Sequence, residues 1–185
     1  MTKYRVGFAV ALVVFALDQL TKWFVTGPLG LNELGDQLTL LPILQFTYTE
    51  NNGISLGLLN ATNPVGRWML VALTSVIAAA VAVWIGREEN RTDKLALGLV
   101  LGGALGNILD RTLHGYVTDF LDLHFRGVPA NLCPSFDNGL CRPFLIFNVG
   151  DAAISIGVVI LLLRAFLARK DHREGQEPKE TIEHA

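Results

Sequence analysis

The 185-residue sequence has few charged residues, few cysteines and no surplus of basic residues. Charged residues make up 17% of the chain and hydrophobic residues 51%, a composition that excludes an ordinary soluble domain. A net charge of -2 excludes the basic surface that nucleic-acid binding requires, so we expect no nucleic-acid partner. No internal repeat is present, and we predict a single integral membrane domain over residues 1–170.

Four apolar runs are candidate transmembrane helices, since each approaches the roughly 20 residues that cross a bilayer. They lie at about 6–25, 68–86, 95–110 and 144–167. The first run is preceded by Lys3 and Arg5, as in a cleavable signal peptide. No small-residue cleavage site follows it, and Asp18 and Lys22 would be unusual in such a segment, so we expect it to be retained. The chain is predicted to be a mainly α membrane protein with four transmembrane helices.

Basic residues predict the orientation of the four spans, because Lys and Arg mark the cytoplasmic side. Ten of the fifteen lie near the two termini and in the loop between the second and third runs. Both termini are therefore expected in the cytoplasm, with residues 26–67 and 111–142 outside. Residues 171–185 are polar, lack an apolar period and are predicted to form a disordered cytoplasmic tail.

The first external segment is predicted to form a small sheet on the outer membrane surface. Residues 39–49 are rich in β-branched and aromatic side chains, and residues 51–53 read Asn-Asn-Gly, a turn signal. Pro42 is expected at a strand start or edge, because it cannot donate a ladder hydrogen bond. The apolar residues 54–59 are expected to return towards the bilayer.

The second external segment contains both cysteines, Cys133 and Cys141. An oxidising compartment permits a disulfide between them. Two free thiols in a disordered insertion are an equally open alternative.

Carboxylates at membrane depth are costly, so they indicate a functional site. Asp119 and Asp151 each lie in a polar motif that we place at the same end of an apolar helix. At about 1.5 Å per residue, Asp18, Asp110 and Asp151 lie roughly 20 to 24 Å from the inner interface. This shared depth in the outer half of the bilayer predicts one site.

Spacing places polar partners on common helix faces, because residues three or four apart are neighbours. Such pairs are Asn107 with Asp110, Asn148 with Asp151, and Asp18 with Lys22. Arg111 adjoins Asp110 and has the geometry to bind a carboxylate through two hydrogen bonds. Three glycines, at positions 102, 103 and 106, permit close helix packing.

Most of these residues also have a purely structural interpretation. Asp18 with Lys22 is interpreted first as an ion pair, and Asp110 with Arg111 as a clamp. The amides of Asn107 and Asn148 would serve equally as hydrogen bonds between helices. Asp119 and Asp151 are harder to explain structurally, because neither has an obvious cation in its motif. Aspartic proteases use two neighbouring carboxylates that share one proton, and a converging Asp119 and Asp151 would have this chemistry.

Three alternatives remain at this point. His114 and His124 flank Asp119 and suggest a metal site as one alternative. They are ten residues apart in an irregular region, which is not a typical ligand spacing, so we expect no metal and no cofactor. Cys133 and Cys141 suggest a membrane thiol oxidoreductase as a second alternative. Such enzymes usually pass electrons from one cysteine pair to another, whereas this chain has a single pair. A proton or ion pathway would spread acids through the membrane depth, whereas the inner half carries none.

The ordered motifs closely resemble those of the lipoprotein signal peptidase family, also called signal peptidase II. The matching segments are residues 18–22 (Asp-Gln-Leu-Thr-Lys), 51–53, 102–111, 117–120 and 147–151. The resemblance covers nearly the whole chain from Asp18 to about Ile156. Two departures are Ser55-Leu56-Gly57, where the family commonly has Ala-Phe-Ser, and a longer segment between Asp119 and Asp151.

The resemblance implies a four-helix membrane bundle with a small external β-cradle and a short outer helix. It implies that Asp119 and Asp151 are the catalytic pair of an aspartic endopeptidase. The supporting polar residues would be Asp18, Lys22, Asn51, Asn107, Asp110, Arg111 and Asn148. The implied substrate is a prolipoprotein carrying a diacylglyceryl-modified cysteine, cut just before that cysteine in the bacterial cytoplasmic membrane. Its partners would be this substrate and membrane lipid, and we expect a monomer.

Overall fold

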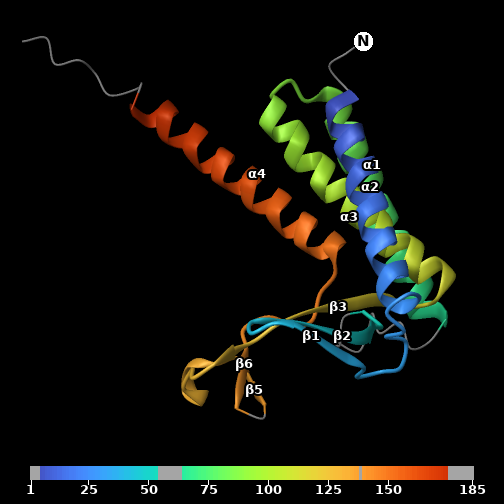
Figure 1. The fold of residues 1–185 in the computed structure, drawn as a ribbon. Helices are drawn as coiled ribbons and strands as arrows, with labels where there is room; N and C mark the ends of the chain where they lie inside the picture. The colour runs from blue at the N-terminus through green and yellow to red at the C-terminus, as the bar shows by residue number, and fades with distance from the viewer. Residues whose placement is uncertain (1–4, 54–63, 138, 175–185) are drawn as a thin grey trace, which may run out of the picture.

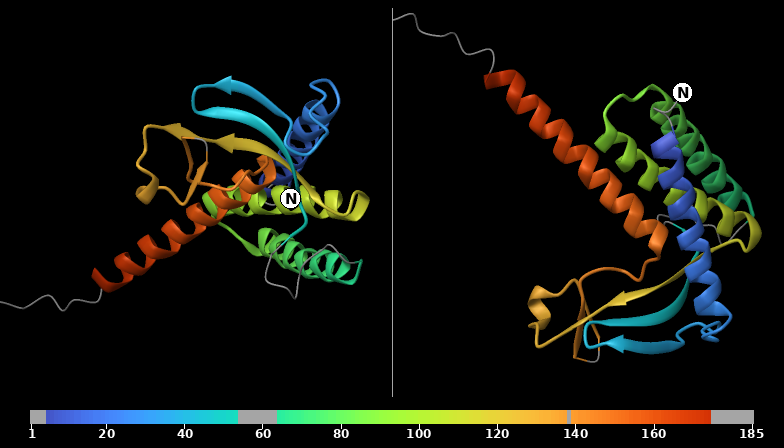
Figure 2. Two further views of the ribbon diagram at one scale, coloured as in Figure 1. Left: turned by 90° about the horizontal axis from the view of Figure 1, so that it is seen from below. Right: turned by 45° about the horizontal axis from the view of Figure 1, so that its top comes forward.

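The computed structural model describes residues 5–53, 64–137 and 139–174. Four long helices occupy one end of the molecule and two small sheets the other (Figures 1 and 2). The first three helices lie side by side, and the last lies at an angle to them, with its C-terminal end pointing away. The helices are α1 (Arg5–Thr26), α2 (Pro64–Arg87), α3 (Arg91–Leu113) and α4 (Val149–Glu174). All four are long and apolar enough to cross a membrane, with the span of α4 ending at Leu167. The predicted membrane-protein class with four spanning helices is confirmed.

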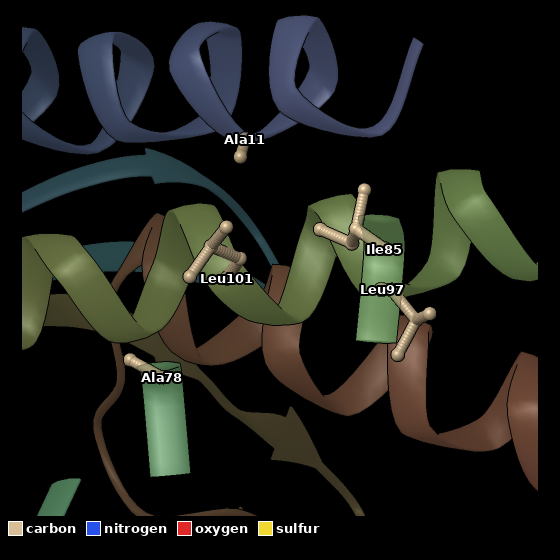
Figure 3. Packing of buried hydrophobic residues seen from close by; sticks show 5 residues of the cluster. All are labelled: Ala11, Ala78, Ile85, Leu97 and Leu101. Carbon is tan, nitrogen blue, oxygen red and sulfur yellow. The ribbon is translucent and has the colours of Figure 1, made fainter. Parts of the chain in front are cut away.

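Helix α3 is the central helix of the bundle, because it packs against each of the other three. Buried residues from α1, α2 and α3 form an apolar cluster where these helices meet (Figure 3). Its members are Ala11, Ala78, Ile85, Leu97 and Leu101. The outward faces of the helices carry large exposed apolar side chains, as lipid contact requires.

Glycines allow α3 to approach its neighbours closely, as the sequence predicted. A Cβ atom on Gly102 would lie 2.5 Å from the carbonyl oxygen of Ala11, so α1 and α3 meet backbone to backbone. A Cβ atom on Gly157 of α4 would lie 2.5 Å from the carbonyl oxygen of Ala96 in the same way. Small residues at helix contacts are how membrane helices gain packing energy.

The first sheet has the strand order β1-β2-β3 and is antiparallel throughout. Its strands are β1 (Gln37–Leu41), β2 (Leu44–Asn51) and β3 (Val117–Leu123). The predicted strand region at 39–49 is therefore a hairpin, with Pro42 in the turn between β1 and β2. Strand β3 was not predicted. Asp119 lies on this strand, so its placement at the end of a helix was wrong.

The second sheet lies in the segment that carries the cysteines and has the order β4-β6-β5. It consists of β4 (Phe125–Arg126), β5 (Ser135–Asp137) and β6 (Leu140–Arg142), with a 3₁₀ turn, η1 (Ala130–Leu132), before β5. Cys133 and Cys141 form a disulfide, which decides between the two alternatives that the sequence left open. This short sheet was not predicted.

Helix α4 starts later than predicted, at Val149 instead of about residue 144. Phe147 pairs with Leu121 as an isolated β-bridge, so the backbone before the helix is extended. The Oδ1 atom of Asn148 accepts the backbone N–H of Asp151 at 2.9 Å, which caps the first turn. Helix α4 continues to Glu174, past the predicted start of the tail at residue 171.

Two predictions fall on residues that the structure does not describe. The return of residues 54–59 towards the bilayer lies outside the described residues, as does most of the tail, residues 175–185. Both stay predictions. The short outer helix is likewise unplaced, because the external residues described contain only the single turn η1.

Candidate active site

Asp119 and Asp151 are linked through the side chains of two asparagines. The amide of Asn148 donates to Asp119 Oδ1 at 2.6 Å, and the amide of Asn107 donates to Asp151 Oδ1 at 2.7 Å. The two amides also meet each other, because Asn148 Nδ2 donates to Asn107 Oδ1 at 3.2 Å. Residues from β3, α3 and α4 are thereby brought into one hydrogen-bonded group.

Strand β2 completes the surroundings of Asp119. The amide of Asn51 donates to Asp119 Oδ2 at 3.0 Å, while its own Oδ1 accepts the backbone N–H of Gly53. Gly53 has φ of 94°, a conformation that glycine adopts readily, so the predicted turn orients Asn51. An extra residue in β2, between the pairs Phe46–Leu121 and Thr49–Asp119, forms a β-bulge next to this contact.

The environment of Asp119 disfavours its charged form. Burial raises the pKa of Asp119 to about 7, and the charge of Asp151 acts in the same direction. The hydrogen bonds from Asn51 and Asn148 and the charge of Lys22 oppose this shift without cancelling it. At neutral pH a substantial fraction of Asp119 is therefore protonated.

A buried ion-pair group lies next to the two aspartates. Lys22 Nζ is 2.7 Å from Asp18 Oδ2 and 2.9 Å from Asp110 Oδ2. All three side chains are almost fully buried. The predicted pairing of Asp18 with Lys22 is confirmed, but Asp110 pairs with Lys22 and not with the neighbouring Arg111.

This group connects three helices and the first sheet. Asp18 Oδ1 accepts the backbone N–H of Gly150 at 2.8 Å, which joins α1 to the start of α4. Asp110 Oδ2 accepts the backbone N–H of Thr118 at 3.1 Å, which joins α3 to the residue before Asp119. Asp18 and Asp110, which were predicted to lie at one depth, thus meet on Lys22. Asp151 is connected to them through Asn107, whose Oδ1 accepts from Lys22 Nζ at 3.4 Å and whose amide donates to Asp151 Oδ1.

Arg111 is placed differently from the clamp that the sequence predicted. Within the described residues it makes no ion pair within 4.0 Å, and its buried Nε has no hydrogen-bond partner. Its positive charge interacts at longer range with Asp151, Asp119 and Asp110. A buried donor without a protein partner is available to a bound molecule.

Three groups that hydrogen-bond within this site were not predicted from the sequence. Gln19 donates to Asp18 Oδ2 at 3.2 Å and to Asp110 Oδ1 at 3.0 Å. A polar amide within an apolar run was the available signal for it. The backbone N–H groups of Gly150 and Thr118 also contribute, and no sequence pattern identifies a backbone donor.

A pocket of about 340 Å³ opens beside Asp151, and its walls are almost entirely apolar. Helix α4 supplies one wall, and the segment before this helix supplies much of the other. The lining residues are Leu123, Phe144, Leu145, Phe147, Asp151, Ala152, Ser155 and Ile156. No group of three or more His, Cys, Asp or Glu side chains suited to a metal lies in the described part of the chain.

Comparisons with known proteins agree with this arrangement. The sequence profile of the family described as "Signal peptidase (SPase) II" matches residues 10–167. A protein of Rhizorhabdus wittichii named lipoprotein signal peptidase is 47% identical over 96% of this chain and 92% of its own length. A protein of the same name from Sphingopyxis alaskensis is 49% identical over 88% of this chain and 86% of its own.

A solved structure is also similar over nearly the full length. It is described as a bacterial membrane enzyme determined by the in meso method at 2.3 Å resolution. It superposes with a TM-score of 0.70 at 27% identity, covering 94% of this chain and 93% of its own. The chain belongs to the signal peptidase II family.

Proposed function

We propose that this chain is an aspartic endopeptidase that removes signal peptides from diacylglyceryl-modified prolipoproteins, cutting just before the lipidated cysteine. Membership in the signal peptidase II family supports the reaction class and the kind of substrate. The observation that supports the chemistry is the convergence of Asp119 and Asp151 on the paired amides of Asn107 and Asn148.

The two aspartates have different surroundings, which assigns them different roles. Asp119 is the protonated member, because burial and the neighbouring charge raise its pKa. Asp151 is assigned the role of proton acceptor, because it lies in the first turn of α4, where helix N–H groups favour a negative charge.

In the first step, the Asp151 carboxylate takes a proton from a water molecule, and the water oxygen attacks the scissile carbonyl carbon. The proton of Asp119 passes to the carbonyl oxygen, which yields a neutral tetrahedral diol. In the second step, Asp151 returns its proton to the leaving nitrogen, the C–N bond breaks, and one diol hydroxyl gives its proton back to Asp119. The products are a carboxylic acid and a free amine, and both aspartates regain their starting states.

The neighbouring residues hold this pair in place and contact the substrate. Asn107, Asn148 and Asn51 fix the orientation of the two carboxylates through the bonds described above. Arg111 donates to a backbone carbonyl of the substrate, since its buried Nε has no partner among the described residues. The polar group of Asp18, Lys22 and Asp110 holds the backbone next to each aspartate, through the N–H groups of Gly150 and Thr118.

The apolar pocket beside Asp151 receives the lipid-bearing part of the substrate. Its α4 wall belongs to a membrane-spanning helix, so acyl chains enter it directly from the bilayer. The cut bond then lies at the sheet end of the spans. In this orientation both termini are cytoplasmic, the sheets are extracytoplasmic, and the chain acts as a monomer in the cytoplasmic membrane.

The decisive experiment compares Asp119→Asn and Asp151→Asn with wild type on a lipid-modified and an unmodified precursor. We expect wild type to cut only the lipid-modified precursor. Each Asn variant should lose activity by roughly 10³-fold, because one proton transfer is removed. Glu33→Gln, an acid-to-amide change at an exposed position, is the matched control and should keep full activity. Near-normal cleavage by either Asp variant would show that the pair is not catalytic.

A further inference from the structure

A second cavity, of about 400 Å³, opens beside Asp119. None of its lining residues belongs to a membrane-spanning helix. They come from β2 and the residues just after it, from β3, from the disulfide-bonded sheet and from the segment that precedes α4. These residues are Thr49, Glu50, Asn51, Gly53, Asp119, Ser135, Arg142, Phe144, Leu145 and Ile146.

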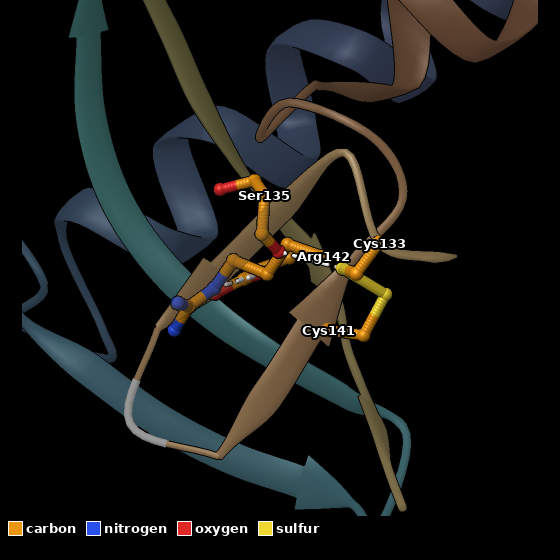
Figure 4. Close-up of a disulfide and its surroundings, with 5 residues drawn as sticks. Cys133, Ser135, Cys141 and Arg142 are labelled. Carbon is orange, nitrogen blue, oxygen red and sulfur yellow. Dashed lines mark hydrogen bonds and ion pairs between the residues drawn. A yellow bond between two sulfur atoms is a disulfide. The ribbon is translucent and has the colours of Figure 1, made fainter. Parts of the chain in front are cut away.

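The disulfide-bonded sheet forms one wall of this cavity through Ser135 and Arg142. The two residues face each other in the register of β5 and β6. Cys141, the residue before Arg142, is buried and bonded to Cys133, which lies just before β5 (Figure 4). The disulfide therefore ties the two sides of the hairpin together close to the residues that line the cavity.

Arg142 fixes this wall relative to Asp119. Its Nε donates to Asp122 Oδ1 at 3.2 Å and to Oδ2 at 3.1 Å. Asp122 is 1% exposed and also accepts hydrogen bonds from Gln45 at 2.7 Å and Thr47 at 3.1 Å. Because Asp122 and Asp119 share strand β3, the wall and the candidate catalytic carboxylate are held by one strand.

The two cavities have different chemistry but a common boundary. Phe144 and Leu145 line both of them. The cavity beside Asp151 is apolar, whereas the cavity beside Asp119 presents Glu50, Asn51 and Ser135. Asp151 lines the first cavity and Asp119 lines the second. An extended polypeptide needs partners for its N–H and C=O groups, and only the second cavity offers several.

We propose that the cavity beside Asp119 binds the first residues of the mature polypeptide, those that follow the lipidated cysteine. The paired strands β5 and β6 form its outer wall, and Arg142 is the residue that positions this wall. The inference rests on the proposed function, which places the lipid-bearing cysteine beside Asp151. From there the mature chain runs towards the sheets, while the apolar signal peptide stays with the spans.

The test uses two synthetic substrates with the same signal peptide and the same diacylglyceryl cysteine. The short substrate ends one residue after the cysteine, and the long substrate carries ten residues of mature sequence. We compare purified full-length wild type with Arg142→Gln and with Cys133→Ala/Cys141→Ala. Arg126→Gln, an exposed arginine on β4 of the same sheet, is the matched control.

We expect KM for the long substrate to rise about fivefold to tenfold in both test variants, with kcat unchanged. The short substrate should be cut with wild-type KM and kcat, which also shows that the variants are folded. The control should match wild type on both substrates.

Equal losses on both substrates would overturn the inference, because they would show that the hairpin only supports the fold. Unchanged KM for the long substrate in both variants would also overturn it. Failure of wild type to cut either lipid-modified substrate would contradict the proposed function itself, and is thus distinguishable from failure of this inference.

Discussion

The side chain of Asp119 shows how burial makes one carboxylate different from another. Its oxygens accept two amide hydrogen bonds, which normally favour ionisation, yet burial and the nearby Asp151 charge outweigh them. The folded-state pKa therefore lies near 7 instead of 3.8. Such a group is least costly to the fold when it is protonated.

The pH dependence follows from this raised pKa. Wild type gains stability from protonated Asp119 below pH 4, and this contribution is lost as pH rises through about 7. Asp119→Asn should therefore match wild type at about pH 4 and melt at a higher temperature near pH 8. Over the same range kcat/KM of wild type should fall above pH 7, because Asp119 then loses the proton that it gives to the carbonyl oxygen. Thermal unfolding in detergent and initial rates measure the two effects.

Comparison with Glu33→Gln tests whether the pH dependence of stability comes from the raised pKa of Asp119. This exposed acid-to-amide variant should keep the same difference in melting temperature from wild type at both pH values. A pH-independent offset for Asp119→Asn would mean that its carboxyl is not perturbed in the fold.

Lys22 neutralises two buried carboxylates at once, so its removal should be severe. Lys22→Met leaves Asp18 and Asp110 buried without a cation, which costs about 3–5 kcal/mol of unfolding free energy. Leu20→Met changes an exposed, lipid-facing position of the same helix and should cost little. Denaturant or thermal unfolding in detergent distinguishes them, and equal stability of the two variants would contradict the structural role of the ion pairs.

At the scale of elements, α3 determines how the bundle packs. Half of its span is buried, compared with 17% for α4 and 22% for α2. Its glycines face α1 and α4 where backbones come into contact. The same helix carries Asn107, Asp110 and Arg111 at its sheet end, so a shift of α3 would move all three.

Gly102→Ala should therefore destabilise the fold and lower activity. The added Cβ would lie 2.5 Å from the carbonyl oxygen of Ala11 and 2.7 Å from the Cβ of Val14, so α1 must move. Overpacking of this kind costs about 1–3 kcal/mol. Gly86→Ala on α2 is the control, because its Cβ would meet nothing within 4 Å and should be neutral or slightly stabilising. Melting temperatures of the purified proteins test this, and equal values would argue against close α1–α3 packing.

At the scale of the whole molecule, the start of α1 and the end of α4 lie at the end away from the sheets (Figure 1). The loop between α2 and α3 lies at that end as well. Basic residues cluster there in the sequence, which predicts the cytoplasmic side. The sheets and the candidate site then face outwards, where a disulfide is stable.

This orientation can be measured by cysteine labelling in intact cells. We expect Leu34→Cys, at an exposed position of the sheet end, to react with a membrane-impermeant maleimide. Glu89→Cys, exposed between α2 and α3, should react only after the cells are opened. The native cysteines are bonded to each other and do not contribute. Labelling of position 89 but not 34 in intact cells would reverse the orientation.

The extent to which the site was predictable depended on the type of secondary structure. The pairing of Asp18 with Lys22 was predictable because both lie on one helix, four residues apart. Asn148 was placed on a helix but precedes it, because Phe147 is extended and pairs with Leu121. The second sheet escaped prediction because its strands have three residues or fewer and carry no clear alternation.

The sequence by itself determined the membrane class and the four spans, because the apolar length of a helix depends on local order along the chain. Only the tertiary structure decided that Lys22 and not Arg111 neutralises Asp110, that two asparagines connect the carboxylates, and that Cys133 and Cys141 are bonded. These outcomes depend on how residues far apart in the chain pack together. The close backbone contacts of α3 and the pairing of β3 with β2 bring these residues together. Neither contact can be predicted from one segment of the sequence alone.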